Sequence, residues 1–162
     1  MQIRILALAA VIYATIFGPA AAAQSPAPYS AIEVDPFVAD RSVPFPMDYQ
    51  KALVEDIARE ASVVFKTAII LRQGDAPPFG HAVLRISGTV IGFKSGSSAK
   101  ALLPGFGSSG ISVRAQVRFA DASSGQVLLI RQVKGTIDPK GADSFARQIA
   151  KLCDENRFVQ SQ

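Results

Sequence analysis

Residues 111–136, with the sequence ISVRAQVRFADASSGQVLLIRQVKGT, contain the pattern that decides the fold. In the first part of this stretch apolar and polar side chains alternate, and the apolar ones are Ile111, Val113, Ala115, Val117 and Phe119. A period of two places these side chains on one face of an extended chain, which predicts a half-buried β-strand. The turn residues DASSG separate this strand from the apolar run QVLLIRQVKGT, so the stretch predicts a β-hairpin.

The turn also fixes which residues share a face of the hairpin. We expect a short loop, Ser123-Ser124-Gly125, with Gly125 in the left-handed conformation. This loop sets three cross-strand pairs: Ala122 with Gln126, Phe119 with Leu129, and Ala115 with Val133. The core face would then hold Phe119 together with Val127, Leu129 and Val133. The opposite face would hold Arg114, Gln116, Arg118, Leu128, Ile130, Gln132 and Lys134.

The rest of the globular part predicts further strands and two helices. Apolar and β-branched runs predict strands at residues 31–38, 63–71 and 82–93. Asp48 is expected to cap a helix that runs to about Ala61. Its apolar stripe would hold Leu53, Ile57 and Ala61, and its outer face Lys51, Glu55 and Arg59. A last helix from about Asp143 has its apolar stripe at Phe145, Ile149, Leu152 and Cys153.

The order of these elements, β-α-β-β-β-β-α, predicts an α+β fold with a mostly antiparallel sheet. The first strand, first helix and second strand would form one parallel crossover, and such crossovers are almost always right-handed. Both helices are therefore expected to pack on one face of the sheet. The opposite face, called the far face below, is expected to be open.

The loop GFGSSG, Gly105 to Gly110, has the G-x-G-x-x-G spacing of dinucleotide-binding proteins. Such a loop needs a helix directly after the glycines, because the free N–H groups of that helix hold the pyrophosphate. Here an alternating strand follows Gly110, and the acidic residue expected about 20 residues later would lie near the apolar Ile130. The sequence therefore predicts a loop from about Lys94 to Gly110 that binds no NAD, FAD or ATP.

Other catalytic or cofactor sites are not indicated by the sequence. His81 is the only histidine, no G-x-S-x-G motif surrounds a serine, and no spacing is typical of a metal site. Cys153, the only cysteine, lies on an apolar stripe, so we expect an inert thiol and no internal disulfide. We expect no catalytic residue and no cofactor, although a Ser-His-Asp site built from distant segments stays open. A pocket lined by His81 and a carboxylate would favour an enzyme, and a flat open sheet face a binding module.

The amino terminus has the order of a secretory signal peptide. Arg4 precedes an uncharged apolar run, residues 5–17, and Ala21-x-Ala23 fits a signal-peptidase site with Gln24 as the first mature residue. A helix formed by that run would span about 20 Å, short of a hydrocarbon core of roughly 30 Å, so no stable membrane span is expected. The sequence thus predicts a signal peptide at 1–23, a proline-rich spacer at 24–30 and a single α+β domain at 31–158.

Charge and cysteine usage narrow the compartment and the partners. No cysteine lies near the cleavage site to accept a lipid, so we expect a periplasmic or extracellular protein. The formal net charge is +4, and the basic residues are scattered singly. Because nucleic-acid binding usually needs a basic stripe interleaved with aromatic residues, we expect no nucleic-acid partner.

Residues 84–128 resemble the bacterial family catalogued as domain of unknown function 4410. The likeness rests on a strand ending in GTVIGF, the turn KSGSSAK, the loop GFGSSG, an alternating strand and the hairpin DASSGQVL. It extends back to the strand AIEVDPF and forward to the last helix. The resemblance implies a short exported protein without an assigned activity, and many members are lipoproteins. The element order also resembles, more loosely, the curli secretion lipoprotein and the N-terminal domain of the translocation protein TolB, which bind partner proteins.

These observations favour an exported, non-catalytic module of the bacterial envelope. Its far face would contact another envelope protein or an anionic surface polymer through Arg114, Arg118, Leu128, Ile130 and Lys134, because exposed aliphatic residues among cations are typical of binding patches. Two alternatives stay open. The chain could be a small hydrolase or transferase with an unrecognised site. It could also be a structural domain with no ligand, in which the long basic side chains only shield their apolar neighbours from water. The identity of a partner and the oligomeric state do not follow from the sequence.

Overall fold

The computed structural model describes residues 29–95, 111–137 and 144–159. Within them the elements are β1 (Ala31–Ala39), α1 (Met47–Val64), β2 (Ile69–Arg72), β3 (Val83–Lys94), β4 (Ile111–Asp121), β5 (Val127–Ile137) and α2 (Ser144–Glu155). This order confirms the predicted α+β fold, β-α-β-β-β-β-α. The predicted signal peptide, most of the spacer and the loop GFGSSG lie outside the described residues, but β4 shows that a strand follows Gly110, as predicted.

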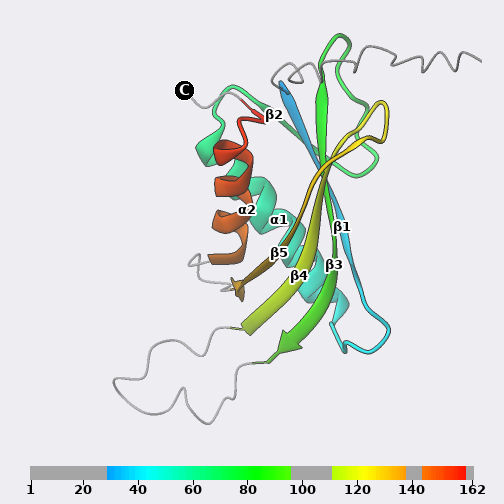
Figure 1. Ribbon diagram of the computed structural model, residues 1–162, viewed down its shortest axis with the longest axis vertical. Coiled ribbons are helices and arrows are strands. Elements are labelled where there is room, and N and C mark those ends of the chain that lie inside the picture. The colour runs from blue at the N-terminus through cyan, green and yellow to red at the C-terminus, as the bar shows by residue number, and fades with distance from the viewer. Residues whose placement is uncertain (1–28, 96–110, 138–143, 160–162) are drawn as a thin grey trace, which may run out of the picture.

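The strands form one mixed sheet in the order β2-β1-β3-β4-β5 (Figure 1). β1 runs parallel to both β2 and β3, whereas β4 is antiparallel to β3 and to β5. The parallel crossover from β1 through α1 to β2 is therefore present as predicted. The parallel pairing of β1 with β3 is an addition that the sequence did not indicate. Because β1 lies between β2 and β3, the segment that joins these two strands has to pass across β1.

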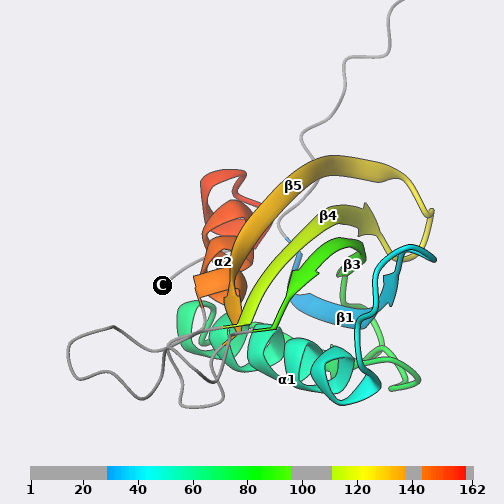
Figure 2. The same cartoon turned by 90° about the horizontal axis from the view of Figure 1, so that it is seen from below.

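Both helices pack on one face of the sheet, as predicted (Figure 2). Their apolar stripes are buried there at Leu53, Ile57, Ala61, Phe145, Ile149 and Cys153. The inward-facing strand residues meet these stripes, among them Ile32, Ile86, Val117 and Phe119, each at most 1% exposed. Burial of this apolar surface stabilises the domain by about 25 cal/mol per Å².

The second strand and the start of the first helix differ from the prediction. α1 continues to Val64, and β2 is confined to Ile69–Arg72, so the strand predicted from Val63 is wrong in its first half. The β-branched residues there favour a strand only weakly, and the buried stripe of the helix overrides that preference. Asp48 does not cap α1, because Pro46 occupies the N-cap position without a side-chain hydrogen bond. Asp48 lies instead in the first turn, where a carboxylate suits the helix dipole.

The hairpin has the predicted register along most of its length but not at its turn. Phe119 lies opposite Leu129 and Ala115 opposite Val133, and Gly125 has the expected left-handed φ of 71°. A bulge after Phe119 then places Ala120 opposite Val127. The backbone N–H of Asp121 donates to the carbonyl of Gln126 at 2.9 Å, so the loop is longer than expected and the pairing of Ala122 with Gln126 is wrong.

The bulge changes the surroundings of two side chains. Val127, predicted to lie in the core, is 42% exposed. Leu128, predicted to lie on the far face, packs against the main core cluster. An extra residue on one strand breaks the alternation of faces at that point, which a regular two-residue period does not anticipate.

A second, smaller apolar cluster lies where β1 and β3 begin. Ala31 and Val83 are buried there with Leu71, and Ala122 packs against them. Since strand neighbours point to opposite faces, and since Ile32 and Leu84 belong to the main core, this cluster lies on the far face. Residues of the 73–82 segment border it, so this corner of the far face is not open as predicted.

Candidate functional site

The far face carries the predicted cations on β4 and β5. Arg114 lies directly opposite Lys134, and Arg118 directly opposite Ile130. All three basic side chains are exposed, and Ile130 is 47% exposed. The structure thus brings together four of the five predicted residues, and Leu128 is the one that it places elsewhere. Lys94 at the end of β3 is also exposed, and it lies on the strand next to β4. We call Lys94, Arg114, Arg118, Ile130 and Lys134 the basic face.

A hollow of about 320 Å³ lies at one end of the basic face. Among the residues that the structure describes, its lining consists of Ile91, Gly92, Phe93, Lys94, Ser112, Arg114 and Lys134, three of them cations and none of them acidic. Like charges gathered without a counter-ion create a positive potential that attracts anions. Lys94 was missed by the sequence analysis. Its position depends on the pairing of Lys94 with Ser112 after a bulge in β3, and no local pattern reveals that pairing.

A second hollow of about 440 Å³ occupies the middle of the far face. Its lining includes Arg118 and Ile130 together with Asp35 and the 64% exposed Val38 from β1. The guanidinium of Arg118 donates to the carbonyl of Gly125 at 3.3 Å, which steadies it beside the hairpin turn. Burial, and then the charge of Glu33, raise the pKa of Asp35. The charge on the far face therefore changes from acidic at β1 to basic at β4 and β5.

A pocket of about 370 Å³ lies at the corner covered by the 73–82 segment. It is lined by His81 and by the carboxylates of Glu33, Asp75 and Asp121, the combination expected to favour an enzyme. His81 Nδ1 lies 2.9 Å from the hydroxyl oxygen of Ser30, and this contact is exposed to solvent.

The carboxylates of this pocket are engaged in structural contacts. Glu33 accepts a hydrogen bond from Arg85 Nε at 2.9 Å, and Asp75 accepts the backbone N–H of Arg72 at 2.8 Å. Among the described residues no carboxylate bonds the imidazole of His81, so the pair formed by Ser30 and His81 lacks the third group that orients the base in a catalytic triad.

Asp121 is held by the turn that follows β4. Its Oδ1 accepts hydrogen bonds from the backbone N–H and the hydroxyl of Ser123 and of Ser124, at 2.6 to 3.0 Å. These bonds hold the pKa of Asp121 well below its usual range. Burial, followed by the charge of Asp121, raises the pKa of the neighbouring Tyr29 to about 12. The local backbone bonding predicted for Asp121 is therefore present, and it accounts for this residue without catalysis.

The remaining candidates for chemistry fit structural roles. Cys153 is fully buried, and burial raises the pKa of its thiol to about 12, so the thiolate that reacts as a nucleophile does not form near neutral pH. In the described ranges, no group of three His, Cys, Asp or Glu side chains is placed to hold a metal ion. No helix in that part of the chain is long and apolar enough to cross a membrane.

Comparison with known proteins identifies the fold but no family. No family model matches the chain, and no curated protein matches it. Among solved structures, the PelC dodecamer from Paraburkholderia phytofirmans is 15% identical over 82% of this chain and 90% of that one, with a TM-score of 0.51. A Xanthomonas campestris protein of the DUF330 family is 14% identical over 81% and 82%, with a TM-score of 0.44. Lipoprotein GNA1162 from Neisseria meningitidis is 15% identical over 79% and 95%, with a TM-score of 0.41. At these identities the likeness to PelC shows a shared fold.

Proposed function

We propose that the protein is an exported, non-catalytic module of the bacterial envelope. In this proposal its basic face contacts another envelope protein or an anionic surface polymer. The observation that carries the proposal is the hollow where Lys94, Arg114 and Lys134 meet with no acidic residue among its described lining, on a sheet face that neither helix covers. Cations in such a hollow raise the local concentration of anionic partners and speed their association.

Two further features support a binding role. Exposed Ile130 and Ile91 offer apolar contact next to the cations, and interfaces combine apolar centres with polar rims. The proposed membership of the domain of unknown function 4410 family, and export through a cleaved signal peptide, would place such a face in the envelope. PelC, which shares the fold, was solved as a dodecamer, so self-association is a competing role for this protein.

A charge reversal on the basic face tests this function. We expect Arg114→Glu with Arg118→Glu to remove the crosslinked partner from a pull-down in the native envelope, because both substitutions reverse the charge that attracts it. Lys51→Glu with Lys66→Glu changes the net charge equally at exposed positions in α1 and just after it, outside the basic face, and serves as the control. Circular dichroism and the elution volume check that each variant is folded and unchanged in size. An unchanged interaction profile in the folded double variant would show that the basic face is only solvated surface.

A small hydrolase or transferase remains the alternative, and the observation that favours it is the contact of Ser30 with His81, which lines the corner pocket. Covalent labelling separates the two functions. A serine-reactive fluorophosphonate that modified Ser30, and lost that reaction in His81→Ala, would support the hydrolase, because only an activated serine reacts.

A further inference from the structure

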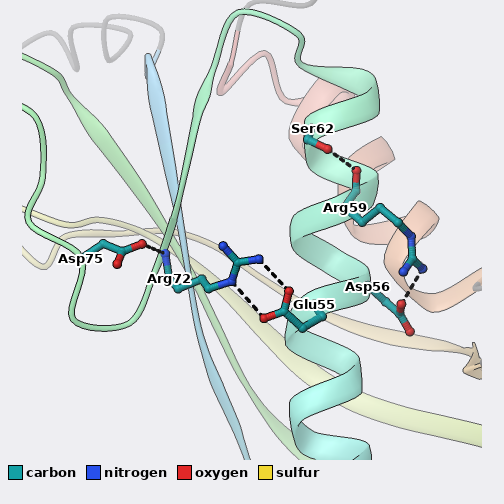
Figure 3. A network of polar contacts seen from close by, with 6 residues as sticks. All are labelled: Glu55, Asp56, Arg59, Ser62, Arg72 and Asp75. Carbon is teal, nitrogen blue, oxygen red and sulfur yellow. Dashed lines mark hydrogen bonds and ion pairs between the residues drawn. The ribbon is translucent and has the colours of Figure 1, made fainter.

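The two edges of the sheet are finished differently. One edge is the short strand β2, Ile69–Arg72, and its last residue is hydrogen-bonded to α1. Arg72 donates two hydrogen bonds to Glu55 of α1, at 2.9 and 2.7 Å, and its backbone N–H donates to Asp75 at 2.8 Å (Figure 3). β1 extends past the end of β2 and forms the edge of the sheet there. In that part it carries Pro36, which has no backbone N–H to donate. Short length, proline and engaged side chains are the devices that keep an edge from pairing with another chain.

The other edge is β5, and its hydrogen bonds show which backbone groups point outward. The N–H of Thr136 donates to the hydroxyl of Ser144 at 2.8 Å, and the carbonyl of Lys134 accepts from Gln148 Nε2 at 2.9 Å. In an antiparallel strand the N–H and C=O of one residue point the same way, and the direction alternates along the chain. Since the backbone groups of Lys134 and Thr136 point away from β4, the backbone N–H and C=O groups of Ile130 and Gln132 point away from it too. The carbonyl of Ile130 agrees with this assignment, because within the described ranges it accepts only from the side chain of Arg131, at 3.4 Å.

α2 covers only the last part of this edge. The helix starts beside the end of β5, whereas the start of β5 at the hairpin turn lies away from it (Figure 1). In the part of the chain that the structure describes, the N–H groups of Ile130 and Gln132 and the carbonyl of Gln132 have no hydrogen-bond partner in the protein. A row of free groups at a sheet edge is a template for an added strand.

The charges around this edge select one kind of strand. β5 contains Arg131 and Lys134 and no acidic residue, and β4 beside it carries Arg114 and Arg118. Side chains of an added strand would alternate between the far face, with Ile130 and Lys134, and the opposite face, with Arg131. Opposite charges directly across strands stabilise pairing, and like charges destabilise it. A second copy pairing through its own β5 would bring these cations together, which disfavours self-association at this edge.

We propose that the outer edge of β5 at Ile130–Gln132 binds an extended acidic segment of a partner protein as an added β-strand. This inference rests on the proposed function and specifies the class of partner. The free backbone groups supply the hydrogen bonds, Arg131 and Lys134 supply the preference for acidic side chains, and Ile130 supplies an apolar contact. The same cations repel basic strands and offer a neutral strand no ion pair, so the edge favours an acidic segment.

Capped synthetic peptides test the class of ligand. We expect the acidic peptide TEVEVET to bind the full domain, and its neutral counterpart TQVQVQT to bind at least about tenfold more weakly. Methylation of the backbone nitrogens of the three central residues should also weaken binding about tenfold, because it removes N–H groups needed for strand pairing while the charge is kept. If TEVEVET does not bind, or if the methylated or neutral peptide binds equally well, the proposal is wrong.

Variants and amide exchange locate the binding edge. Gln132→Pro removes an outward N–H without changing charge, and an edge strand tolerates proline at such a position; Gln132→Thr keeps the N–H and is its control. We expect Gln132→Pro to weaken peptide binding about tenfold and Gln132→Thr to leave it within about twofold. Binding should also protect the Ile130 and Gln132 amides of the unmodified protein from hydrogen exchange. Binding without that protection overturns the proposal even if Gln132→Pro fails to fold.

Two further results separate this inference from the proposed function. Dextran sulfate carries negative charge but no amide edge, so tight binding of dextran sulfate with no protection of Gln132, and no binding of the peptide, would identify a polymer-binding face and overturn the added strand. That outcome would leave the proposed function intact. An Arg114→Glu, Arg118→Glu variant that kept every envelope partner would instead remove the proposed function, whatever the peptides do.

Discussion

Asp121 ends β4, and a single oxygen of its carboxylate organises the turn that follows. Four hydrogen bonds from Ser123 and Ser124 converge on that oxygen. The residue types in DASSG predict such bonding, because aspartate accepts from backbone groups two and three residues later. The left-handed Gly125 was predictable for the same local reason. The contact of Asp121 with Tyr29 was not, because Tyr29 is distant in the sequence.

Replacing Asp121 by asparagine should lower stability in a pH-dependent way. The folded-state pKa of Asp121 is depressed, so its charge contributes stability above the unfolded-state pKa of about 3.9, and this contribution is lost as the pH falls toward the folded-state pKa. We expect Asp121→Asn to reduce the free energy of unfolding by about 1 kcal/mol at pH 7, because hydrogen bonds to a charged acceptor are replaced by neutral ones.

Urea unfolding of both proteins between about pH 3 and pH 7 measures this difference. The gap between the wild type and Asp121→Asn should narrow as the pH falls below about 4. Asp154→Asn, the same chemical change at an exposed position of α2, is the control. A gap that stayed constant over the whole range would show that the charge of Asp121 does not stabilise the turn.

At the scale of elements, local patterns predicted the hairpin of β4 and β5 far better than the edge strand β2. Strict alternation in β4 determines its faces, so Arg114 and Arg118 could be placed from the sequence. Leu128 could not, because a bulge is set by the geometry of two paired strands. The short β2 was mispredicted because packing of α1 decides how far the helix continues. Lys94 could not be assigned to the basic face either, because its place there depends on the register between β3 and β4, which pairs residues far apart in sequence.

The contact of β5 with α2 depends on a glycine, and a substitution tests it. A Cβ atom at Gly135 would lie 2.6 Å from the Phe145 backbone at the start of α2, closer than real contacts allow. We expect Gly135→Ala to reduce the free energy of unfolding by about 2 kcal/mol, because the helix must move off the strand. At Gly92 the nearest atom would be 3.5 Å away, so Gly92→Ala is the matched control with little change. Thermal unfolding compares the two, and equal melting temperatures would contradict this account of the contact.

At the scale of the whole molecule, the two ends of the described domain are joined. The backbone N–H of Tyr29, just before β1, donates to the carbonyl of Phe158 at 2.7 Å. Tyr29 also forms an isolated parallel bridge with Val159. The ring of Phe158 packs against Phe119 of β4, with 5.7 Å between centroids. The residues after α2 therefore close the core against the central sheet, and they connect the first and last segments without a disulfide.

Truncation of Phe158 tests whether this closure supports the whole domain. Phe158 is 9% exposed, so Phe158→Ala removes a buried aromatic ring and leaves a cavity against Phe119. We expect the free energy of unfolding to fall by about 3 kcal/mol in one cooperative transition, because the segment belongs to the single core. Phe79→Ala makes the same chemical change at a residue that is fully exposed in the 73–82 segment, and it should stay within about 0.5 kcal/mol of the wild type. Urea unfolding followed by circular dichroism measures both variants. If Phe158→Ala were as stable as Phe79→Ala, the carboxyl-terminal segment would be an appendage, and the join between the ends would not stabilise the fold.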